Sequence, residues 1–447
     1  MRKTTTSLLI GAAFLTTAAM AQAAAPADVT AAKAQIDSVL DKNYPALEAM
    51  YKDIHSHPEV AFQEQRTAAL LAEKMRGLGF TVTEHVGKTG VVALYKNGDG
   101  PVVLVRTELD ALPMEEKTGL PYASRAQQTV DGKSTFVAHT CGHDSHMAWW
   151  LGTAQALLAM KDQWHGTLMF IGQPAEEVLG GATAMLSDGL FTKFPKPDYG
   201  FAAHVSNAPA GEVVVKQGVV SSASDNFFIT FKGVGAHGSM PDKGVDPIME
   251  GVNFVSDVQT VISRQKDPQK FGVITVGSFN GGTVANIIPD HADLQLTLRS
   301  FDPDVRKLLK DGVVNTANSV AQMARAPAPD VRLMSGTSPV VNDSKLAADT
   351  AGVLKVALGD GQVTLVSSYE PGGNASEDYS EYVVAGVPKS VFFGIGGYDT
   401  QTIAKYKSEG KPLPVNHSPF FAPNPEASIR TGVRTLTLAV LSVTSRK

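Results

Sequence analysis

The segment 139–146 (HTCGHDSH) gathers the residues with the greatest capacity for chemistry. It holds three of the eleven histidines and the only cysteine of the chain. Thiolate and imidazole are preferred ligands of zinc-like ions, and Cys141 and His143, placed before a helix, can bind one ion together. The H-E-x-x-H pattern of helix-borne zinc sites is absent, because its glutamate is missing and Gly142 interrupts the segment. The cluster therefore predicts a metal site, although each histidine alone could be a solvent-facing residue.

A pair of adjacent carboxylates, Glu176 and Glu177, follows the apolar run 168–171. Neighbouring side chains at a strand end point in different directions, so one carboxylate could bind a metal while the other faces a water molecule. An exposed acidic turn is the plain alternative. Strand ends of α/β sheets are where active sites cluster, which favours a functional pair.

His204 lies in an apolar segment and His417 in a loop, and either could be an ordinary structural histidine. With Cys141, His143 and Glu177 they would complete five ligands, enough for two ions that share a water molecule. Spacing alone does not show that these five residues converge. Cys141 has no partner for a disulfide in its own chain, so it is a buried thiol, a reactive thiol or a metal ligand.

The elements that must position these residues alternate between strands and helices. Residues 31–78 are expected to be helical, with breaks at Pro45 and at His57-Pro58. Short β-rich runs at 81–84, 91–95, 102–106 and 167–172, with a helix over 147–160, predict an α/β domain with a mixed, largely parallel sheet covered by helices. The region 334–447 returns to the same alternation.

A second unit interrupts this pattern. Strands are expected at 227–231, 273–278 and 292–300, with helices over 247–263 and from 303. This order predicts a small α+β sandwich, residues 221–333, inserted into a larger α/β domain of residues 24–220 and 334–447.

The N-terminal residues indicate where the protein works, and its net charge narrows the class of its substrate. Arg2 and Lys3, an apolar run over 8–20 and Ala21-Gln22-Ala23 predict a signal peptide, residues 1–23, and an exported, periplasmic or secreted protein. A net charge of −5 and an isoelectric point near 6.1, without a basic stripe, argue against nucleic acid or a membrane as partner. A small neutral or acidic substrate fits better.

Seven blocks in order along the chain resemble the M20 metallopeptidase family. The resemblance is closest to its amidohydrolase branch of hippurate hydrolases, N-acyl-amino-acid hydrolases and auxin-conjugate hydrolases. It covers the chain from about residue 50 to the end and rests on these blocks: RTELDALP at 106–113, HTCGHDSHM at 139–147, QPAEE at 173–177, GAHG at 235–238, ANIIPD at 285–290, SEDY at 376–379 and NHSP at 416–419.

The resemblance implies a role for each matching residue. It implies two divalent ions, zinc, manganese or cobalt, held by Cys141, His143, Glu177, His204 and His417. Among the catalytic groups, Glu176 would be the general base, Asp110 would lie behind the metal site, and His237 would bind the substrate carboxylate or the oxyanion. Asn286 and Arg299 would also approach the substrate, and the insert would act as a lid and as a homodimer contact.

The expected reaction is hydrolysis of the amide bond of an N-acyl amino acid. A carboxypeptidase or dipeptidase with the same site is the first alternative, and a short peptide would then be the substrate. A metal-containing periplasmic binding protein is the second, although a binder needs no base beside its ligands. A cysteine hydrolase is the third, but a metal-bound thiolate is a poor free nucleophile.

Overall fold

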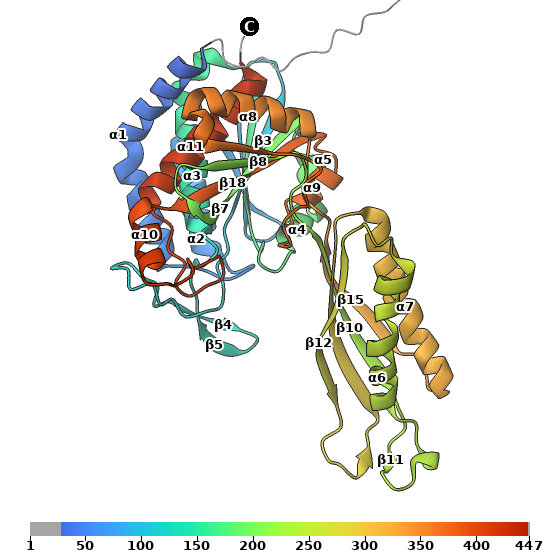
Figure 1. The fold of residues 1–447 in the computed structure, drawn as a ribbon. Helices are drawn as coiled ribbons and strands as arrows, with labels where there is room; N and C mark the ends of the chain where they lie inside the picture. Colours follow the sequence, from blue (N-terminus) through green and yellow to red (C-terminus); the bar gives the residue numbers. More distant parts are fainter. Residues whose placement is uncertain (1–27, 446–447) are drawn as a thin grey trace, which may run out of the picture.

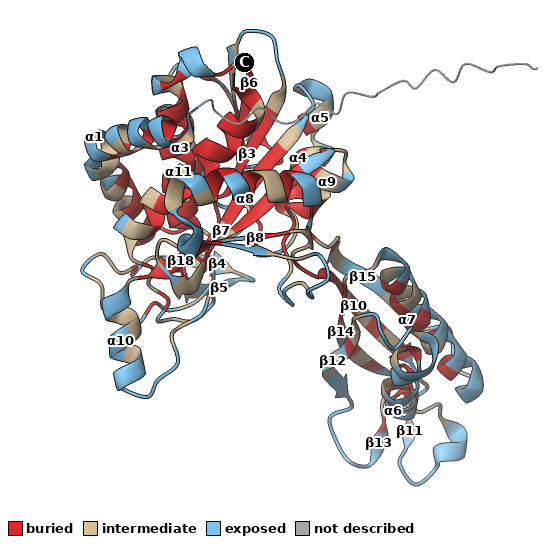
Figure 2. Ribbon diagram, turned by 45° about the horizontal axis from the view of Figure 1, so that its top comes forward, coloured by how far each residue is buried: buried red, intermediate tan, exposed pale blue. Residues whose placement is uncertain are grey.

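The computed structural model describes residues 28–445, so the expected signal peptide lies outside the described residues. Two lobes are visible: a large one and a smaller one that extends away from it (Figure 1). Buried residues concentrate in the sheet and inner helices of the large lobe, with a second, smaller core in the other lobe (Figure 2). None of the helices described between residues 28 and 445 is long and apolar enough to cross a membrane.

The large lobe is built on an eight-stranded mixed sheet in the order β1-β2-β6-β3-β7-β18-β8-β17. The central strands β6, β3, β7 and β18 run parallel, whereas β1, β2 and the β18–β8 pairing are antiparallel. The prediction of a mixed sheet covered by helices is confirmed. The strands are β1 (Thr81–Val86), β2 (Gly90–Asn97), β3 (Val102–Glu108), β6 (Gly166–Gln173), β7 (Tyr199–Pro209), β8 (Val213–Lys216), β17 (Val363–Val366) and β18 (Lys389–Tyr398).

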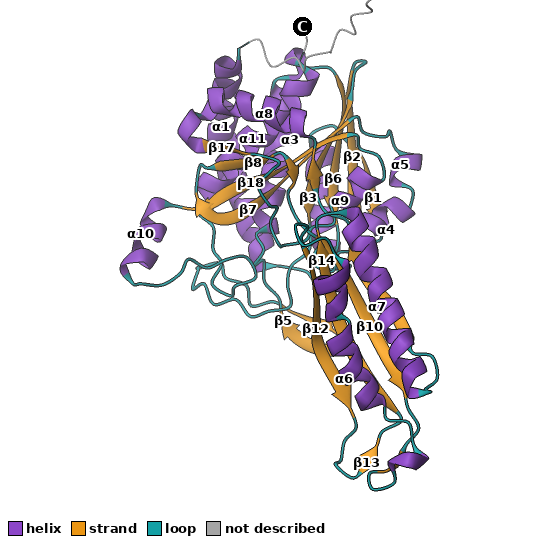
Figure 3. Ribbon diagram, turned by 45° about the vertical axis from the view of Figure 1, so that its right-hand side comes forward, coloured by secondary structure: helices purple, strands orange, loops and turns teal. Residues whose placement is uncertain are grey.

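Helices cover both faces of this sheet (Figure 3). Alternate residues of β6 show why: Leu168 and Phe170 join one buried cluster, and Met169 and Ile171 join another on the opposite face. The helices of this lobe are α1 (Val29–Ser56), α2 (Gln65–Gly77), α3 (His143–Ala159), α4 (Gly181–Ser187), α5 (Leu190–Lys193), α8 (Ser344–Leu358), α9 (Ser380–Val384), α10 (Thr400–Ser408) and α11 (Pro425–Thr444). A hairpin, β4 (Gln127–Val130) and β5 (Lys133–Phe136), extends from it.

Two helix boundaries differ from the expected ones. The predicted break at Pro45 is wrong, because α1 runs through it. Pro45 is exposed, so its ring lies on the solvent face, the convex side of a helix that curves around its core. Helix α3 begins at His143 rather than at 147, because Gly142 takes up the left-handed conformation (φ 95°) that starts it.

The smaller lobe, called the lid below, is a four-stranded antiparallel sheet in the order β12-β14-β10-β15 with two helices. Strand β15 was not expected, and it crosses the predicted boundary at 333. Its exposed central residues give it no clear alternation. The elements are β10 (Ala223–Lys232), α6 (Pro247–Asp257), β12 (Gly272–Gly281), β14 (His291–Ser300), α7 (Pro303–Ala324) and β15 (Asp330–Thr337), with a small ladder of β11 (Ala236–His237) and β13 (Ile287–Ile288) at the tip.

Candidate metal centre

The five predicted metal ligands converge at one end of the central strands. Cys141 and His143 lie on the loop before α3 and at its first residue, Glu177 follows β6, and His204 lies within β7. His417 reaches the same place from a C-terminal loop, where its N–H donates to the carbonyl of Thr140 (2.9 Å). The parallel strands β3, β6 and β7 end at a common edge, which explains why side chains far apart in sequence meet there.

The donor atoms form two groups that share Cys141. One group is Cys141, His143 and His204, and the other is Cys141, Glu177 and His417; within each, the donor atoms lie within 4.8 Å of one another. Cys141 Sγ is 3.3 Å from His204 Nε2, and Glu177 Oε2 is 3.3 Å from His417 Nε2. A shared thiolate between two groups is an arrangement that suits two neighbouring ions.

Hydrogen bonds orient the imidazoles of His143 and His204. His143 Nδ1 lies 2.8 Å from the carbonyl oxygen of Asp110, and His204 Nδ1 lies 2.8 Å from that of Val205. A carbonyl only accepts, so each Nδ1 donates its proton there, and each Nε2, which faces the cluster, is the nitrogen available to a metal. His143 Nε2 and Glu177 Oε1 are buried and have no hydrogen-bond partner among the described residues. These orphaned atoms fit a bound cation.

Glu176 lies beside the ligands without belonging to either group that shares Cys141. Its Oε2 is 3.7 Å from His143 Nε2, and its side chain is almost fully buried. Burial, together with Glu377 and Glu177, raises the pKa of Glu176 well above its usual range. A carboxyl group at this point can accept or donate a proton next to the metal-binding atoms.

Asp110 holds the cluster from behind. Its Oδ2 accepts the backbone N–H of Glu177 (2.9 Å), and its carbonyl accepts from His143. Its Oδ1 lies 3.6 Å from His143 Nδ1 and has no hydrogen-bond partner in the described part of the chain. Asp110 therefore lies behind the predicted ligands, where its hydrogen bonds hold His143 and the backbone of Glu177.

The electrostatics of the cluster also favour a cation. Burial raises the pKa of Glu177 to about 7, and burial with the nearby carboxylates raises the pKa of the Cys141 thiol well above its usual range. Although burial opposes it, the Asp110 hydrogen bond and the charges of Glu108 and Glu177 raise the pKa of His143 to about 10. The site retains protons because its negative charge exceeds its positive charge, and divalent cations would replace those protons.

His146, part of the sequence cluster, is not free to bind metal. Its Nδ1 is 2.9 Å from Glu108 Oε2, and its Nε2 accepts the backbone N–H of Val205 (2.9 Å). Both ring nitrogens are occupied, so this histidine is structural.

A buried charge network next to Glu176 was not predicted. The guanidinium of Arg106, at the end of β3, binds Glu108, Glu377 (2.7 Å) and Asp378 (3.2 Å). The charge of Arg106 lowers the pKa of Glu176 against the other effects, which raise it. A charged residue directly after the apolar run 102–105 was the signal that could have revealed the network.

The lid residues lie elsewhere. His237 and Asn286 are exposed at the tip, where β11 and β13 stand at the end of the lid far from the large lobe (Figure 1). Arg299 lies near the base and donates to the Ser224 hydroxyl and to the carbonyl of Leu298 (3.2 Å). Within residues 28–445, no hydrogen bond or ion pair joins these three residues to the metal-binding cluster.

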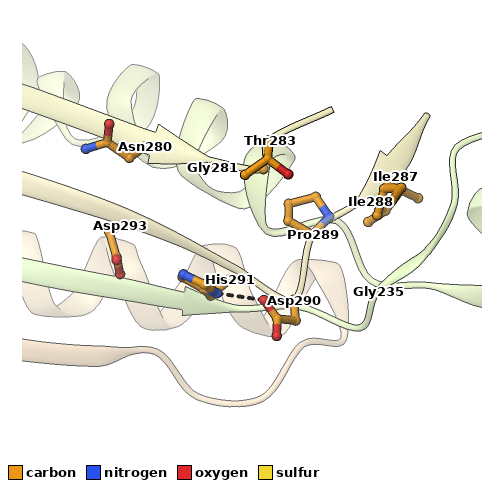
Figure 4. A pocket seen from close by; sticks show the side chains of 11 residues that line it. Gly235, Asn280, Gly281, Thr283, Ile287, Ile288, Pro289, Asp290, His291 and Asp293 are labelled. Carbon is orange, nitrogen blue, oxygen red and sulfur yellow. Dashed lines mark hydrogen bonds and ion pairs between the residues drawn. The ribbon is translucent and has the colours of Figure 1, made fainter. Parts of the chain in front are cut away.

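The lid tip also carries a cavity of about 470 Å³ (Figure 4). All its lining residues lie between Gly235 and Asp293, so it is separate from the metal-binding cluster. Its ionisable groups are already paired: Asp290 binds His291 (2.6 Å), and Asp293 accepts from Thr230 (2.7 Å).

An α/β domain with a buried thiolate, imidazole and carboxylate cluster and an inserted lid defines a metal-dependent hydrolase. Residues 104–440 match the model of "Peptidase family M20/M25/M40". The chain belongs to this family and is a metal-dependent hydrolase of amide bonds.

Known proteins add detail. The chain is 39% identical to the hippurate hydrolase of Campylobacter jejuni over 62% of its own length and 70% of that protein. It is 34% identical to thermostable carboxypeptidase 1 of Saccharolobus solfataricus, over 76% of this chain and 84% of that one. A dinuclear metal-binding peptidase of the M20 family from Bacillus subtilis has the same fold, with a TM-score of 0.69, 26% identity and coverage of 90% and 99%.

Proposed function

We propose that this protein is an exported amidohydrolase that cleaves the amide bond of N-acyl amino acids. The observation that carries the proposal is the position of Glu176, a buried carboxyl group outside the two groups that share Cys141 but within reach of His143 and Glu177, where a base must lie. A protein that only bound metal would need no such residue. Hippurate is N-benzoylglycine, so the similarity to a hippurate hydrolase supports an N-acyl amino acid as substrate.

Cys141, His143, Glu177, His204 and His417 would hold two divalent ions, as the dinuclear relative suggests. The metals, when bound, would lower the pKa of water toward about 7 and polarise the scissile carbonyl. The mixed sulfur, nitrogen and oxygen donors suit zinc, manganese or cobalt.

The residues of the chain would then act on protons and charge. Glu176 would accept a proton from the attacking water as its oxygen bonds to the carbonyl carbon, and would return that proton to the amide nitrogen as the C–N bond breaks. The charge of Arg106 lowers the pKa of Glu176 and so favours release of this proton. The products are a carboxylic acid and a free amino acid.

The lid would supply the remaining contacts. His237 and Asn286 would bind the substrate carboxylate or the oxyanion, and Arg299 would support the lid strand nearby. Because His237 stands at the far tip, it would reach a metal site by lid closure or by insertion into a second subunit of a homodimer. Complementation between two inactive variants separates lid closure from insertion into a second subunit.

Export is part of the proposal and is supported by the sequence of residues 1–23. Cell fractionation and N-terminal sequencing test it. A mature chain that begins at Ala24 in the periplasm or the medium is expected, and a cytoplasmic chain that retains residues 1–23 would contradict it.

The test of the activity is hydrolysis of N-acetyl and N-benzoyl amino acids and of dipeptides by metal-loaded and chelated protein. We expect turnover of the N-acyl amino acids that requires metal. Turnover of dipeptides alone would assign a carboxypeptidase or dipeptidase, the alternative favoured by the similarity to a carboxypeptidase. Metal binding without any turnover, with a ligand that raises the melting temperature, would assign a binding protein.

A further inference from the structure

A single buried carboxyl group outside the metal centre joins three separate segments of the chain. Glu64, at the start of α2, is fully buried. Its Oε1 accepts the backbone N–H groups of Phe62 and of Ala175, both at 2.8 Å, and its Oε2 accepts from the hydroxyl of Thr89. Ala175 immediately precedes Glu176 and Glu177.

The segment that carries this acid pair has an unusual backbone. Ala175 (φ 51°) and Leu179 (φ 52°) are left-handed, a conformation that residues with a Cβ adopt only when their surroundings enforce it. The amides of Gly180 (3.2 Å) and Gly181 (3.1 Å) donate to the carbonyl of Ala175. A Cβ on Gly181 would lie 1.6 Å from the carbonyl oxygen of Pro174, so the turn is closed too tightly for any other residue.

Two buried carboxyl groups accept backbone amides of this turn. Asp110 accepts the amide of Glu177, and Glu64 accepts the amide of Ala175, two residues earlier. Phe62, whose amide is the second donor to Glu64 Oε1, is also left-handed (φ 61°). One oxygen thus stabilises two left-handed residues from different segments.

We propose that Glu64 is a positioning residue that fixes the left-handed backbone at Ala175 and thereby aims Glu176 and Glu177. The roles of those two residues rest on the proposed function. The contact itself depends only on the hydrogen bonds above. It gives the N-terminal segment, which supplies no ligand, a defined part in building the site.

The chemistry of the contact determines the informative substitutions. Burial, reinforced by the charge of Asp110, raises the pKa of Glu64 to about 7, so both protonation states are populated near neutral pH. Oε1 can accept both amides in either state, whereas a protonated Oε2 would donate to Thr89. Glutamine reproduces the protonated form, and methionine keeps the length of the side chain but removes the acceptor.

The experiment compares Glu64→Ala, Glu64→Met and Glu64→Gln with the control Asn342→Ala in the full chain. Asn342 is buried and makes three backbone hydrogen bonds, to Lys216 and Phe392, away from the turn. The measurements are amide hydrogen exchange of the metal-free protein over 174–181, Zn²⁺ affinity by competition with a chelator, and kcat and KM for N-benzoylglycine.

Glu64→Ala and Glu64→Met should speed exchange in this peptide and lower Zn²⁺ affinity and kcat by about 10–100-fold, with little change in KM. Glu64→Gln should stay within about threefold of the wild type, and Asn342→Ala should lose only thermal stability. If Glu64→Ala does not fold, the difference between Glu64→Met and Glu64→Gln in these readouts tests the proposal.

Equal effects of methionine, glutamine and Asn342→Ala on all readouts would overturn the proposal, since Glu64 would then be merely structural. If the wild type hydrolyses nothing, the proposed function fails. Faster exchange and weaker Zn²⁺ binding in the methionine variant would still support the positioning role, and their absence would refute it independently.

Discussion

The metal-binding cluster and the lid tip differ in how completely a single chain builds them. In the large lobe, Cys141 and His143 are buried, His204 is half-buried, and the imidazoles of His143 and His204 are oriented by the carbonyls of Asp110 and Val205. At the tip, His237 is exposed, and between residues 28 and 445 its ring finds a hydrogen-bond partner only in Ser239, two residues along. A single chain therefore assembles the metal-binding cluster, whereas the residues expected to bind substrate remain away from it.

Strand geometry explains the difference. Cluster residues come from the ends of neighbouring parallel strands, which lie side by side. The lid residues are spread along one long strand: from His291 to Arg299 is eight steps of about 3.3 Å, or roughly 26 Å. Asn286 precedes the tip end of that strand, and Arg299 lies at the base, so they cannot form one subsite in a single chain.

The largest effect is expected in the large lobe. Glu176→Gln should lower kcat by about 10²–10⁴-fold, because general base catalysis is lost. Steady-state kinetics with the metal content of the same samples measure this. Metal content should match the wild type, and near-normal turnover would remove Glu176 from the mechanism.

The next effect is expected at the lid tip. His237→Ala should lower kcat by about 10²–10³-fold, the usual effect of removing one oxyanion donor, without changing metal content. An unchanged kcat would show that the tip takes no part in the reaction.

Mixing the Glu176→Gln and His237→Ala proteins then tests how the tip reaches the metal. Recovery of activity on mixing is expected if the lid of one subunit completes the site of the other. Two stable but inactive proteins that remain inactive after exchange of subunits would favour closure of the lid within one chain.

Metal affinity should depend on pH. Glu177, with a pKa raised to about 7, must lose its proton before it binds a cation, so Zn²⁺ affinity should rise at least about tenfold from pH 6 to pH 8. Calorimetric titration in buffers of different ionisation enthalpy measures both the affinity and the released protons. Affinity that is independent of pH would exclude Glu177 as a ligand.

The same shift predicts the opposite trend without metal. A carboxyl group with a raised pKa binds more protons in the folded than in the unfolded chain, so its contribution to stability falls as pH rises from 4.5 toward 7. The gain in melting temperature on adding Zn²⁺ should therefore be larger at pH 8 than at pH 6. Thermal unfolding of matched samples measures it, and an equal gain at both values would contradict the assignment.

The smallest effect is expected at the lid base. Arg299→Ala removes its bonds to Ser224 and Leu298, which should cost about 1 kcal/mol of stability and change KM by less than about threefold. Denaturant unfolding and KM together measure this. A large rise in KM alone would place Arg299 at the substrate instead.

Sequence periodicity predicted the sheet, most helices and the inserted lid, because alternation and turn residues are local signals. It did not predict the link from Arg106 to Glu377, 271 positions away, or that from Glu64 to Ala175, 111 positions away. Contacts between buried charges depend on tertiary packing, which no local pattern encodes. The ligand set came from family resemblance, and its convergence became visible only in the structure.

The most direct test of the central claim is the metal content of the purified full chain, alongside hydrolysis of N-benzoylglycine. Two divalent ions per chain are expected in the wild type. Cys141→Ala should lose both ions, because both donor groups include this thiolate, whereas His417→Ala should retain one. Fewer than one ion in active wild-type protein, or full metal content in Cys141→Ala, would contradict the account.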